Sequence, residues 1–122
     1  MKRLLLILCL AFFSTPSFGQ WTKMAESTQA YSYVDVENIR EKDGYVYYWE
    51  LTDVKPNIKM IFKSSMIYVK VDCAEFKYAN LQASYYDDQM GKGKLLHTTR
   101  NSVWQYPPPN SVTTSVLKRI CK

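Results

Sequence analysis

Apolar residues recur at every second position along much of this chain, and that period restricts the fold more than any other feature. In residues 45–52, one set of alternate positions holds Tyr45, Tyr47, Trp49 and Leu51, and the other holds Val46, Tyr48, Glu50 and Thr52. Residues 66–73 alternate in the same way, with one face made of Ile67, Val69, Val71 and Cys73. Because successive side chains of a strand point to opposite faces of a sheet, this pattern predicts half-buried strands.

Four shorter stretches have the same character, at 21–26, 31–36, 78–86 and 95–100. Turn residues separate the strands, including Lys42-Asp43-Gly44 and the glycine-rich residues 90–93. No helical pattern lies between most of these stretches, so neighbouring strands should pair antiparallel. We expect one antiparallel sheet of about six strands, and with the C-terminal helix described next the fold class is α+β.

The C-terminal residues follow a different pattern. Three prolines at 107–109 cannot continue a strand ladder. Apolar residues then fall at 112, 116, 117 and 120, a spacing typical of a short amphipathic helix. Asn110 or Ser111 can cap its start, and Lys118 and Arg119 lie where the helix dipole favours positive charge. A helix of about ten residues is unstable alone in water, so this one needs the sheet as support.

The first 19 residues have the layout of a secretory signal peptide. Lys2 and Arg3 precede an apolar run over 4–13, and the small residues Ser17 and Gly19 suit signal peptidase. That run is about half of the roughly 20 residues that a membrane anchor needs. We therefore expect a signal peptide at 1–19 and a mature domain at 20–122 that has no transmembrane segment and is periplasmic, surface-bound or secreted.

Cleavage would lower the net charge of the 122-residue chain from +5 to +3, because Lys2 and Arg3 are removed. A mild positive charge is ordinary for a soluble protein. The alternative is that it favours acidic partners, such as sulfated glycans or anionic membrane surfaces, at low salt.

Cleavage also removes Cys9 and leaves Cys73 and Cys121 as the mature thiols. An even pair in an oxidising compartment predicts one disulfide, Cys73 to Cys121. Closing a loop of this length stabilises the fold by about 4 kcal/mol in the chain-entropy model. A redox pair or metal site is disfavoured, because the chain has no Cys-x-x-Cys motif and one histidine. The disulfide would hold the helix on the face that carries Val69 and Val71.

Residue types that carry catalysis are scarce. His97 lies in the predicted strand 95–100, and no serine or cysteine nucleophile motif accompanies it. Asp87 and Asp88 are adjacent, and neighbours in a strand point to opposite faces, so we expect them to end a strand before a turn. The glycines at 91 and 93 lack the spacing of a phosphate-binding loop and predict a hairpin turn. We expect no enzyme, no catalytic residue, no metal and no cofactor.

Landmarks spread over residues 21–121 suggest a family. They are Trp21, Tyr33-Val34-Asp35, Trp49, Asp72-Cys73, Tyr85-Tyr86, Gly91-Lys92-Gly93, Trp104, Pro109-Asn110-Ser111 and Cys121. This pattern resembles the surface-adhesin protein E family of Gram-negative bacteria. The resemblance implies an antiparallel sheet with a C-terminal helix tied to one face by a disulfide. It also implies a binding role, since the family includes surface lipoproteins that bind host extracellular proteins. Ile7 and Leu8 before Cys9 depart from the lipobox of those members.

The sheet face that the helix leaves uncovered is the expected binding surface. We assign to it Tyr48, Tyr68, Lys70 and Tyr86. Tyrosine offers contact area at low entropic cost and keeps a polar tip for water, which suits a protein-binding or dimerisation surface. The alternative is that the sheet curls and buries these tyrosines against its own loops.

Together these features predict an exported, non-enzymatic binding domain, adhesin-like, that contacts host or envelope proteins. The partner is a protein of unknown identity, and a second copy of the chain is a further candidate. Nucleic acid is not expected, because the basic residues are dispersed and the chain is exported. The alternative function is a periplasmic accessory or inhibitor protein of the cell envelope.

Overall fold

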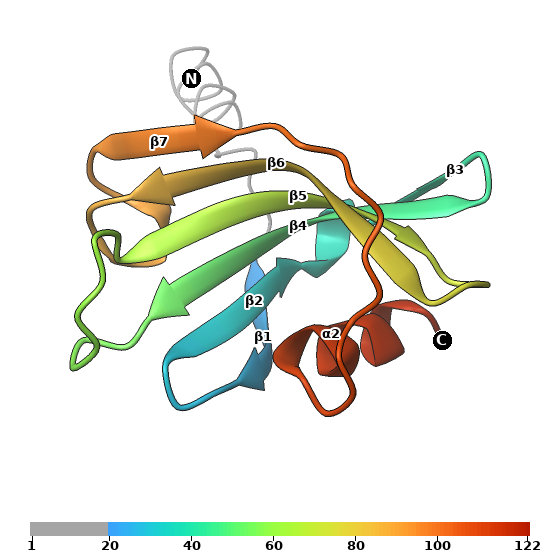
Figure 1. The fold of residues 1–122 in the computed structure, drawn as a ribbon, viewed down its shortest axis with the longest axis horizontal. Coiled ribbons are helices and arrows are strands. Elements are labelled where there is room, and N and C mark those ends of the chain that lie inside the picture. The colour runs from blue at the N-terminus through green and yellow to red at the C-terminus, as the bar shows by residue number, and fades with distance from the viewer. Residues whose placement is uncertain (1–19) are drawn as a thin grey trace, which may run out of the picture.

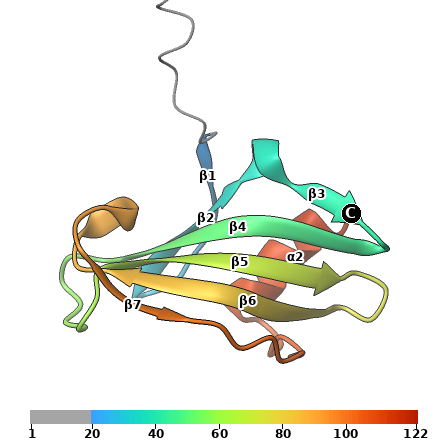
Figure 2. The same cartoon turned by 90° about the horizontal axis from the view of Figure 1, so that it is seen from above.

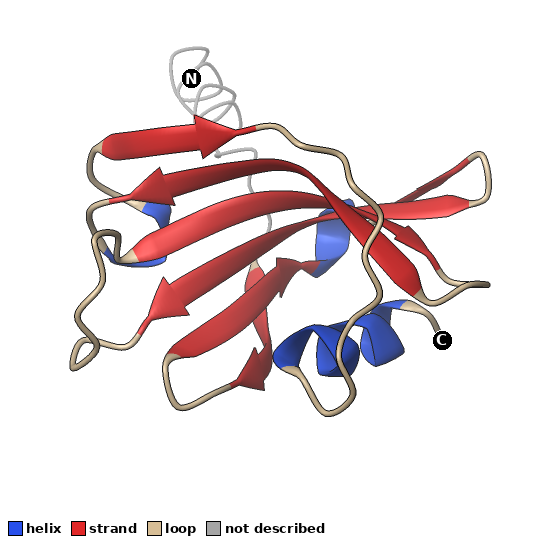
Figure 3. Ribbon diagram, in the orientation of Figure 1, coloured by secondary structure: helices blue, strands red, loops and turns tan. Residues whose placement is uncertain are grey.

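The computed structural model describes residues 20–122, and strands are the most common element among them (Figure 3). The strands are β1 (Trp21–Glu26), β2 (Ala30–Asp35), β3 (Arg40–Lys42), β4 (Tyr45–Val54), β5 (Ser64–Asp72), β6 (Lys77–Tyr86) and β7 (Leu95–Thr99). The helical segments are two short 3-10 turns, η1 (Val36–Asn38) and η2 (Gln89–Gly91), and the helix α2 (Val112–Ile120). The predicted signal peptide, residues 1–19, lies outside the described residues.

All strands pair antiparallel in one sheet, in the order β1-β2-β4-β5-β6-β7, with β3 pairing β4 (Figure 1). The six predicted strands and the C-terminal helix are confirmed, with ends that differ from the predicted ones by two residues at most. β3 was not predicted. Its three residues, Arg40, Glu41 and Lys42, are all charged and so have no apolar alternation that could indicate a strand.

β3 and β4 form a hairpin through the two-residue turn Asp43-Gly44. Both residues have positive φ, 55° for Asp43 and 85° for Gly44. Such a turn matches the twist of the flanking strands, and Asp-Gly is one of its preferred sequences. The hairpin lies at the same end of the sheet as the turn between β5 and β6 (Figures 1 and 2).

The hydrophobic core lies between the sheet and α2. Its fully buried residues come from three central strands and the helix, namely Val34, Tyr48, Val69, Val71, Val116 and Leu117. Each aliphatic side chain buried in this way stabilises the fold by about 1.5 to 3 kcal/mol. The predicted packing of the helix against the side of the sheet that carries Val69 and Val71 is confirmed.

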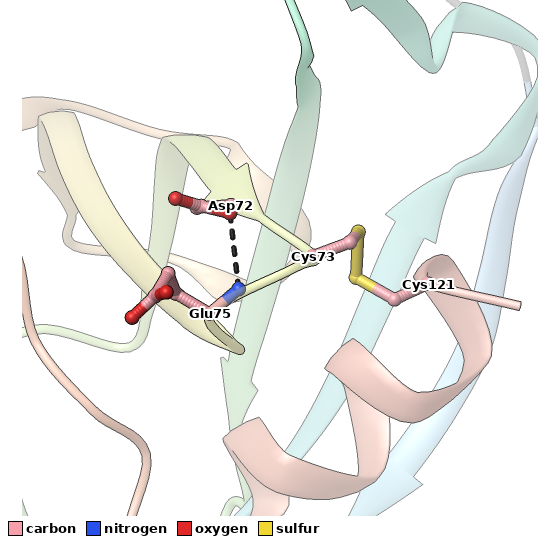
Figure 4. Close-up of a disulfide and its surroundings, with 4 residues drawn as sticks. All are labelled: Asp72, Cys73, Glu75 and Cys121. Atoms are coloured by element: carbon pink, nitrogen blue, oxygen red, sulfur yellow. Dashed lines mark hydrogen bonds between the residues drawn. A yellow bond between two sulfur atoms is a disulfide. The ribbon is translucent and has the colours of Figure 1, made fainter.

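Two features fix the ends of α2. At the start, the hydroxyl oxygen of Ser111 accepts a hydrogen bond from the backbone N–H of Thr114 at 3.1 Å, so Ser111 is the N-cap. At the end, Cys121 is joined to Cys73 by a disulfide, with the two Cα atoms 5.5 Å apart (Figure 4). In the turn after β5, the Asp72 carboxylate accepts a hydrogen bond from the backbone N–H of Glu75 at 3.1 Å (Figure 4). The predicted disulfide between Cys73 and Cys121 is confirmed.

The turn around η2 folds back over the sheet at one end (Figure 2). The Ser64 hydroxyl, fully buried, donates to the carbonyl of Asp88 at 2.6 Å and accepts from the N–H of Gly91 at 2.8 Å. Gly91 has φ 71°, and a Cβ on it would lie 3.1 Å from the sulfur of Met66. This close contact covers Leu51, which is fully buried although it lies on the side of the sheet away from α2.

Candidate functional site

Strand register decides which side chains lie on the face of the sheet away from α2, which we call the open face. Tyr48 pairs with Val69 and lies with it in the core, so the neighbouring pairs Tyr47 with Lys70 and Trp49 with Tyr68 lie on the open face. On β6, Tyr86 pairs with Ser64, Ser84 with Met66 and Gln82 with Tyr68. These residues therefore belong to the open face too.

Aromatic rings are in contact along the open face. The Tyr68 ring lies 4.8 Å from that of Trp49 and 6.0 Å from that of Tyr47, measured between centroids. All three side chains are partly exposed. Aromatic pairs at these separations stabilise one another by about 0.5 to 1.5 kcal/mol beyond their buried area. The rings are thus held in place while part of each still faces solvent.

A shallow hollow of about 150 Å³ lies beside this row of rings, lined by Trp49, Met66, Gln82, Ser84 and Tyr86. It combines two aromatic side chains with a flexible thioether and polar groups. Such a lining suits a side chain of a protein partner better than it suits a small polar substrate.

The structure corrects the predicted position of Tyr48. Tyr48 is 1% exposed and lies in the core under α2, so it cannot belong to the open face. Alternation alone separated Val46, Tyr48 and Glu50 from their neighbours, but it does not say which set faces the helix. Pairing of Tyr48 with Val69 decides that. Of the predicted binding residues, the open face contains Tyr68, Lys70 and Tyr86.

Several aromatic residues of this surface were missed, among them three of β4 and Trp104. Tyr45, Tyr47 and Trp49 share one set of alternate positions in β4, and their sequence pattern would have revealed them once the register was known. Trp104 follows β7 in an irregular segment, and no local pattern marks it. Its ring lies 5.7 Å from that of Tyr45.

One carboxyl group of the sheet lies between the layers. Glu50 lines a cavity of about 70 Å³ with Tyr48, Tyr78, Asn80 and Thr113. The Tyr48 hydroxyl donates to Glu50 Oε1 at 3.2 Å. Burial raises the pKa of Glu50 from its usual 4.5 to about 7, and the hydrogen bond from Tyr48 opposes that rise.

His97 lies in the exposed edge strand β7, with its ring stacked on that of Tyr85 at 6.4 Å between centroids. An apolar hollow of about 360 Å³ beside it is lined by Ile61, Phe62, Tyr85, Leu96, His97 and Thr99. Ile61 is 93% exposed there. β7 thus presents an unpaired edge next to apolar side chains, which is a surface open to pairing with another strand.

The remaining polar residues of the sequence analysis have structural roles. Asp87 Oδ1 accepts from the N–H of Lys94 at 2.7 Å, and Asp88 Oδ1 accepts from the N–H of Gln89 at 2.8 Å. Both residues follow the end of β6, as predicted, and hold the turn that contains Gly91 and Gly93.

Within residues 20–122, His, Cys, Asp and Glu side chains nowhere gather in groups of three that could hold a metal ion. Over the same residues, no helix reaches the length and apolar content that spanning a membrane requires.

Sequence comparison decides the family. A profile of the family described as surface-adhesin protein E matches residues 21–122. The chain belongs to this family. The family resemblance noted from Trp21, Asp72-Cys73 and Cys121 is therefore confirmed. No curated protein matches the chain in sequence.

Solved structures of Haemophilus influenzae protein E share the fold. One matches with a TM-score of 0.63 at 16% identity and covers 88% of this chain and 86% of its own. The structure of crystal form II of Haemophilus influenzae protein E matches with a TM-score of 0.64 at 17% identity and covers 88% of this chain and 90% of its own. A crystal structure of protein E from non-typeable Haemophilus influenzae matches with a TM-score of 0.59 at 16% identity and covers 89% of this chain and 78% of its own. At this identity the likeness shows a common fold.

Proposed function

We propose that this member of the surface-adhesin protein E family is an exported, non-enzymatic protein whose open sheet face binds a protein partner. The observation that carries the proposal is the open face itself. The helix covers the opposite side, while Trp49, Tyr68 and Tyr86 stay partly exposed around a hollow of about 150 Å³. Partly exposed aromatic residues are enriched in the centres of protein interfaces.

Family membership supports an adhesin-like role at the cell surface, and the predicted signal peptide at 1–19 supports export. The proposed contact residues are Tyr68, Lys70 and Tyr86. Tyr48 is not among them, because its side chain is in the core. We propose that the partner is a host or envelope protein.

Replacing Tyr68 by alanine tests the proposed site. We expect the affinity for a partner isolated with the wild-type domain to fall by more than about 1 kcal/mol, or roughly fivefold, since central aromatic residues dominate interfaces. Surface plasmon resonance measures the affinity, and thermal melting measures the stability. Tyr85→Ala is the matched control, because Tyr85 is also partly exposed but lies on the other side of the same sheet. Equal affinity of the wild type and Tyr68→Ala would contradict the site.

The alternative, a periplasmic accessory or inhibitor protein, differs in location. Biotinylation of intact cells with a reagent that cannot cross membranes should label the protein if it is on the surface. Labelling only after permeabilisation would contradict the adhesin role and favour the alternative.

A homodimer stays a prediction. The unpaired edge of β7 beside the exposed Ile61 and Leu96 supports it, because two such edges can pair. Sedimentation velocity of residues 20–122 measures the oligomeric state directly.

A further inference from the structure

A cluster of cations lies on the open face at the end of the sheet where the β3–β4 hairpin and the β5–β6 turn meet. We call it the hairpin-end patch and define it by Arg40, Lys42, Tyr45, Lys70, Lys77 and Trp104. In sequence these residues are scattered over 65 positions. Strand pairing brings the first five together, and the segment after β7 adds Trp104.

Register places the cations in two rows across the strands. In one row, Arg40 pairs with Tyr47, and Tyr47 pairs with Lys70. In the next row, Lys42 pairs with Tyr45, and Lys77 lies further across, paired with Asp72. Neighbouring strands are about 4.8 Å apart, so Arg40 and Lys70 are separated by roughly 10 Å along the row. The positive charges are therefore spaced over a broad surface rather than gathered around one point.

Aromatic rings lie between these cations. Lys70 Nζ lies 4.3 Å from the centre of the Tyr45 ring and 5.5 Å from that of Trp104. Lys77 Nζ lies 5.0 Å from the Trp104 ring. Cation–π contacts at these distances hold the lysine side chains against the rings without neutralising their charge. The connection from β7 to α2, which carries Trp104, runs beside this end of β6, where Gln105 pairs with Tyr78 (Figure 1).

Acidic groups leave this charge largely uncompensated. In the part of the chain that the structure describes, both salt bridges involve Glu26, which pairs with Lys23 and Lys55, and neither includes a patch cation. Asp72, paired with Lys77, is the acid that the register places in the patch, and it also accepts from the N–H of Glu75, so four cations face one carboxylate. Glu41 pairs with Val46 and so faces the other side, and Asp43 lies in the hairpin turn.

We propose that the hairpin-end patch binds a sulfated polysaccharide. Spaced cations match sulfate groups distributed along a stiff chain, and the flat faces of Tyr45 and Trp104 offer contact area for sugar rings. An acidic peptide is a poorer match, because it carries its carboxylates on flexible side chains and offers no sugar rings to the flat faces of Tyr45 and Trp104. This proposal does not rest on the protein-binding role of Tyr68 and Tyr86.

Binding to heparin tests the proposal with residues 20–122. If four cations contact sulfates, raising the salt from 50 to 200 mM should weaken binding about 50-fold, by the counterion release that governs binding to linear polyanions. Lys42→Gln/Lys77→Gln should reduce affinity by more than about tenfold and lower the dependence on salt. The matched control is Lys59→Gln/Lys118→Gln, which removes the same charge from exposed lysines outside the patch. Thermal melting confirms that both variants fold.

Further probes separate the ligand classes. Desulfated heparin should bind at least tenfold more weakly than heparin, and Trp104→Ala should lose affinity while keeping the salt dependence. Absence of heparin binding at 50 mM salt, or equal losses in the two double variants, would overturn the proposal. Tighter binding of polyglutamate or of a single-stranded oligonucleotide than of heparin would overturn it too, in favour of an acidic peptide or a nucleic acid.

Tyr86→Ala separates this proposal from the protein-binding role, because Tyr86 lies outside the patch. That variant should keep full heparin affinity, and a loss equal to that of Lys42→Gln/Lys77→Gln would place the heparin site elsewhere on the open face. Lys70 is left unchanged throughout, since both proposals include it.

Discussion

At the scale of single residues, Glu50 is the group whose surroundings conflict most with its chemistry. Its carboxyl lines the small cavity between the sheet and the start of α2, where it accepts a hydrogen bond from Tyr48. Burial also raises the pKa of the Tyr48 phenol, so Tyr48 stays a hydrogen-bond donor to Glu50 even in alkaline solution. Ionised Glu50 therefore costs stability.

Glu50→Gln should remove that cost. Burial raises the folded-state pKa of Glu50 from its usual 4.5 to about 7, so the folded state binds a proton more tightly than the unfolded state. Below pH 4.5 both states are protonated and there is no penalty; between pH 4.5 and 7 the wild type loses stability, and above pH 7 the loss is complete. We expect the free energy of unfolding of Glu50→Gln to exceed that of the wild type by about 3 kcal/mol at pH 8.

Urea unfolding at pH 4 and pH 8 measures this difference. At pH 4 the two proteins should have similar stability, because Glu50 is protonated in both states. Parallel stability curves for the wild type and Glu50→Gln between pH 4 and pH 8 would rule out the raised pKa. Glu75→Gln, at an exposed turn, is the control for losing a carboxylate.

At the scale of elements, α2 depends on contacts beyond its own length. Nine residues are too few for a helix that is stable in isolation. Val116 and Leu117 are fully buried against the sheet, and Lys118 and Arg119 lie in the last turn, where the helix dipole favours positive charge. The Ser111 cap and the disulfide secure the two ends. The helix is therefore stable because it packs against the sheet.

The Cys121→Ser variant tests how much the disulfide contributes to the free energy of unfolding. The Cys73–Cys121 bond spans 48 positions of sequence, and losing it should lower the free energy of unfolding by about 4 kcal/mol. For a domain of this size that corresponds to a fall in melting temperature of roughly 15 °C or more. Calorimetry under oxidising conditions measures it.

Cys73→Ser is the companion variant. Because both substitutions break the same bond, Cys73→Ser/Cys121→Ser should be about as stable as either single variant. A melting temperature within a few degrees of the wild type for Cys121→Ser would show that the disulfide contributes little. Two free thiols in the oxidised wild-type protein would contradict the bond itself.

At the scale of the whole molecule, the sheet has two unlike sides. One side is sealed by α2 around Tyr48, Val69 and Leu117. The other is covered at one end by the turn around η2 and stays accessible along Tyr68 and the hairpin-end patch. A single short helix cannot cover both faces of a sheet, so one face remains available for binding.

The stabilities of Tyr48→Ala and Tyr68→Ala should differ, because Tyr48 lies on the buried side of the sheet and Tyr68 on the open face. Removing the buried Tyr48 ring should cost about 3 to 5 kcal/mol of stability, as in other large-to-small core substitutions. Tyr68→Ala removes partly exposed contacts with Trp49 and Tyr47 and should cost about 1 kcal/mol. Chemical denaturation of both variants measures the difference. Equal losses would mean that Tyr68 belongs to the core as well.

The sequence by itself predicted the elements and the covalent link between them. Alternation in residues 45–52 and 66–73 marked the central strands, the spacing of residues 112–120 marked the helix, and two cysteines left one intramolecular pairing. Local patterns suffice here because the period of a strand or a helix is a property of its own residues. The signal peptide at 1–19 stays a prediction of the sequence.

The tertiary structure decided which side each strand turns to the helix. Pairing Tyr48 with Val69 put Tyr48 in the core and turned Tyr47, Trp49 and Tyr68 outward. Shifting the register of a strand by one residue moves all of its side chains to the other face. The residues of the strand alone do not specify that register, because it depends on the strand that pairs with it. Strand pairing likewise assembled Arg40, Lys42, Lys70 and Lys77 from three strands, β3, β5 and β6. Their proximity depends on contacts between distant residues, which only the folded sheet creates.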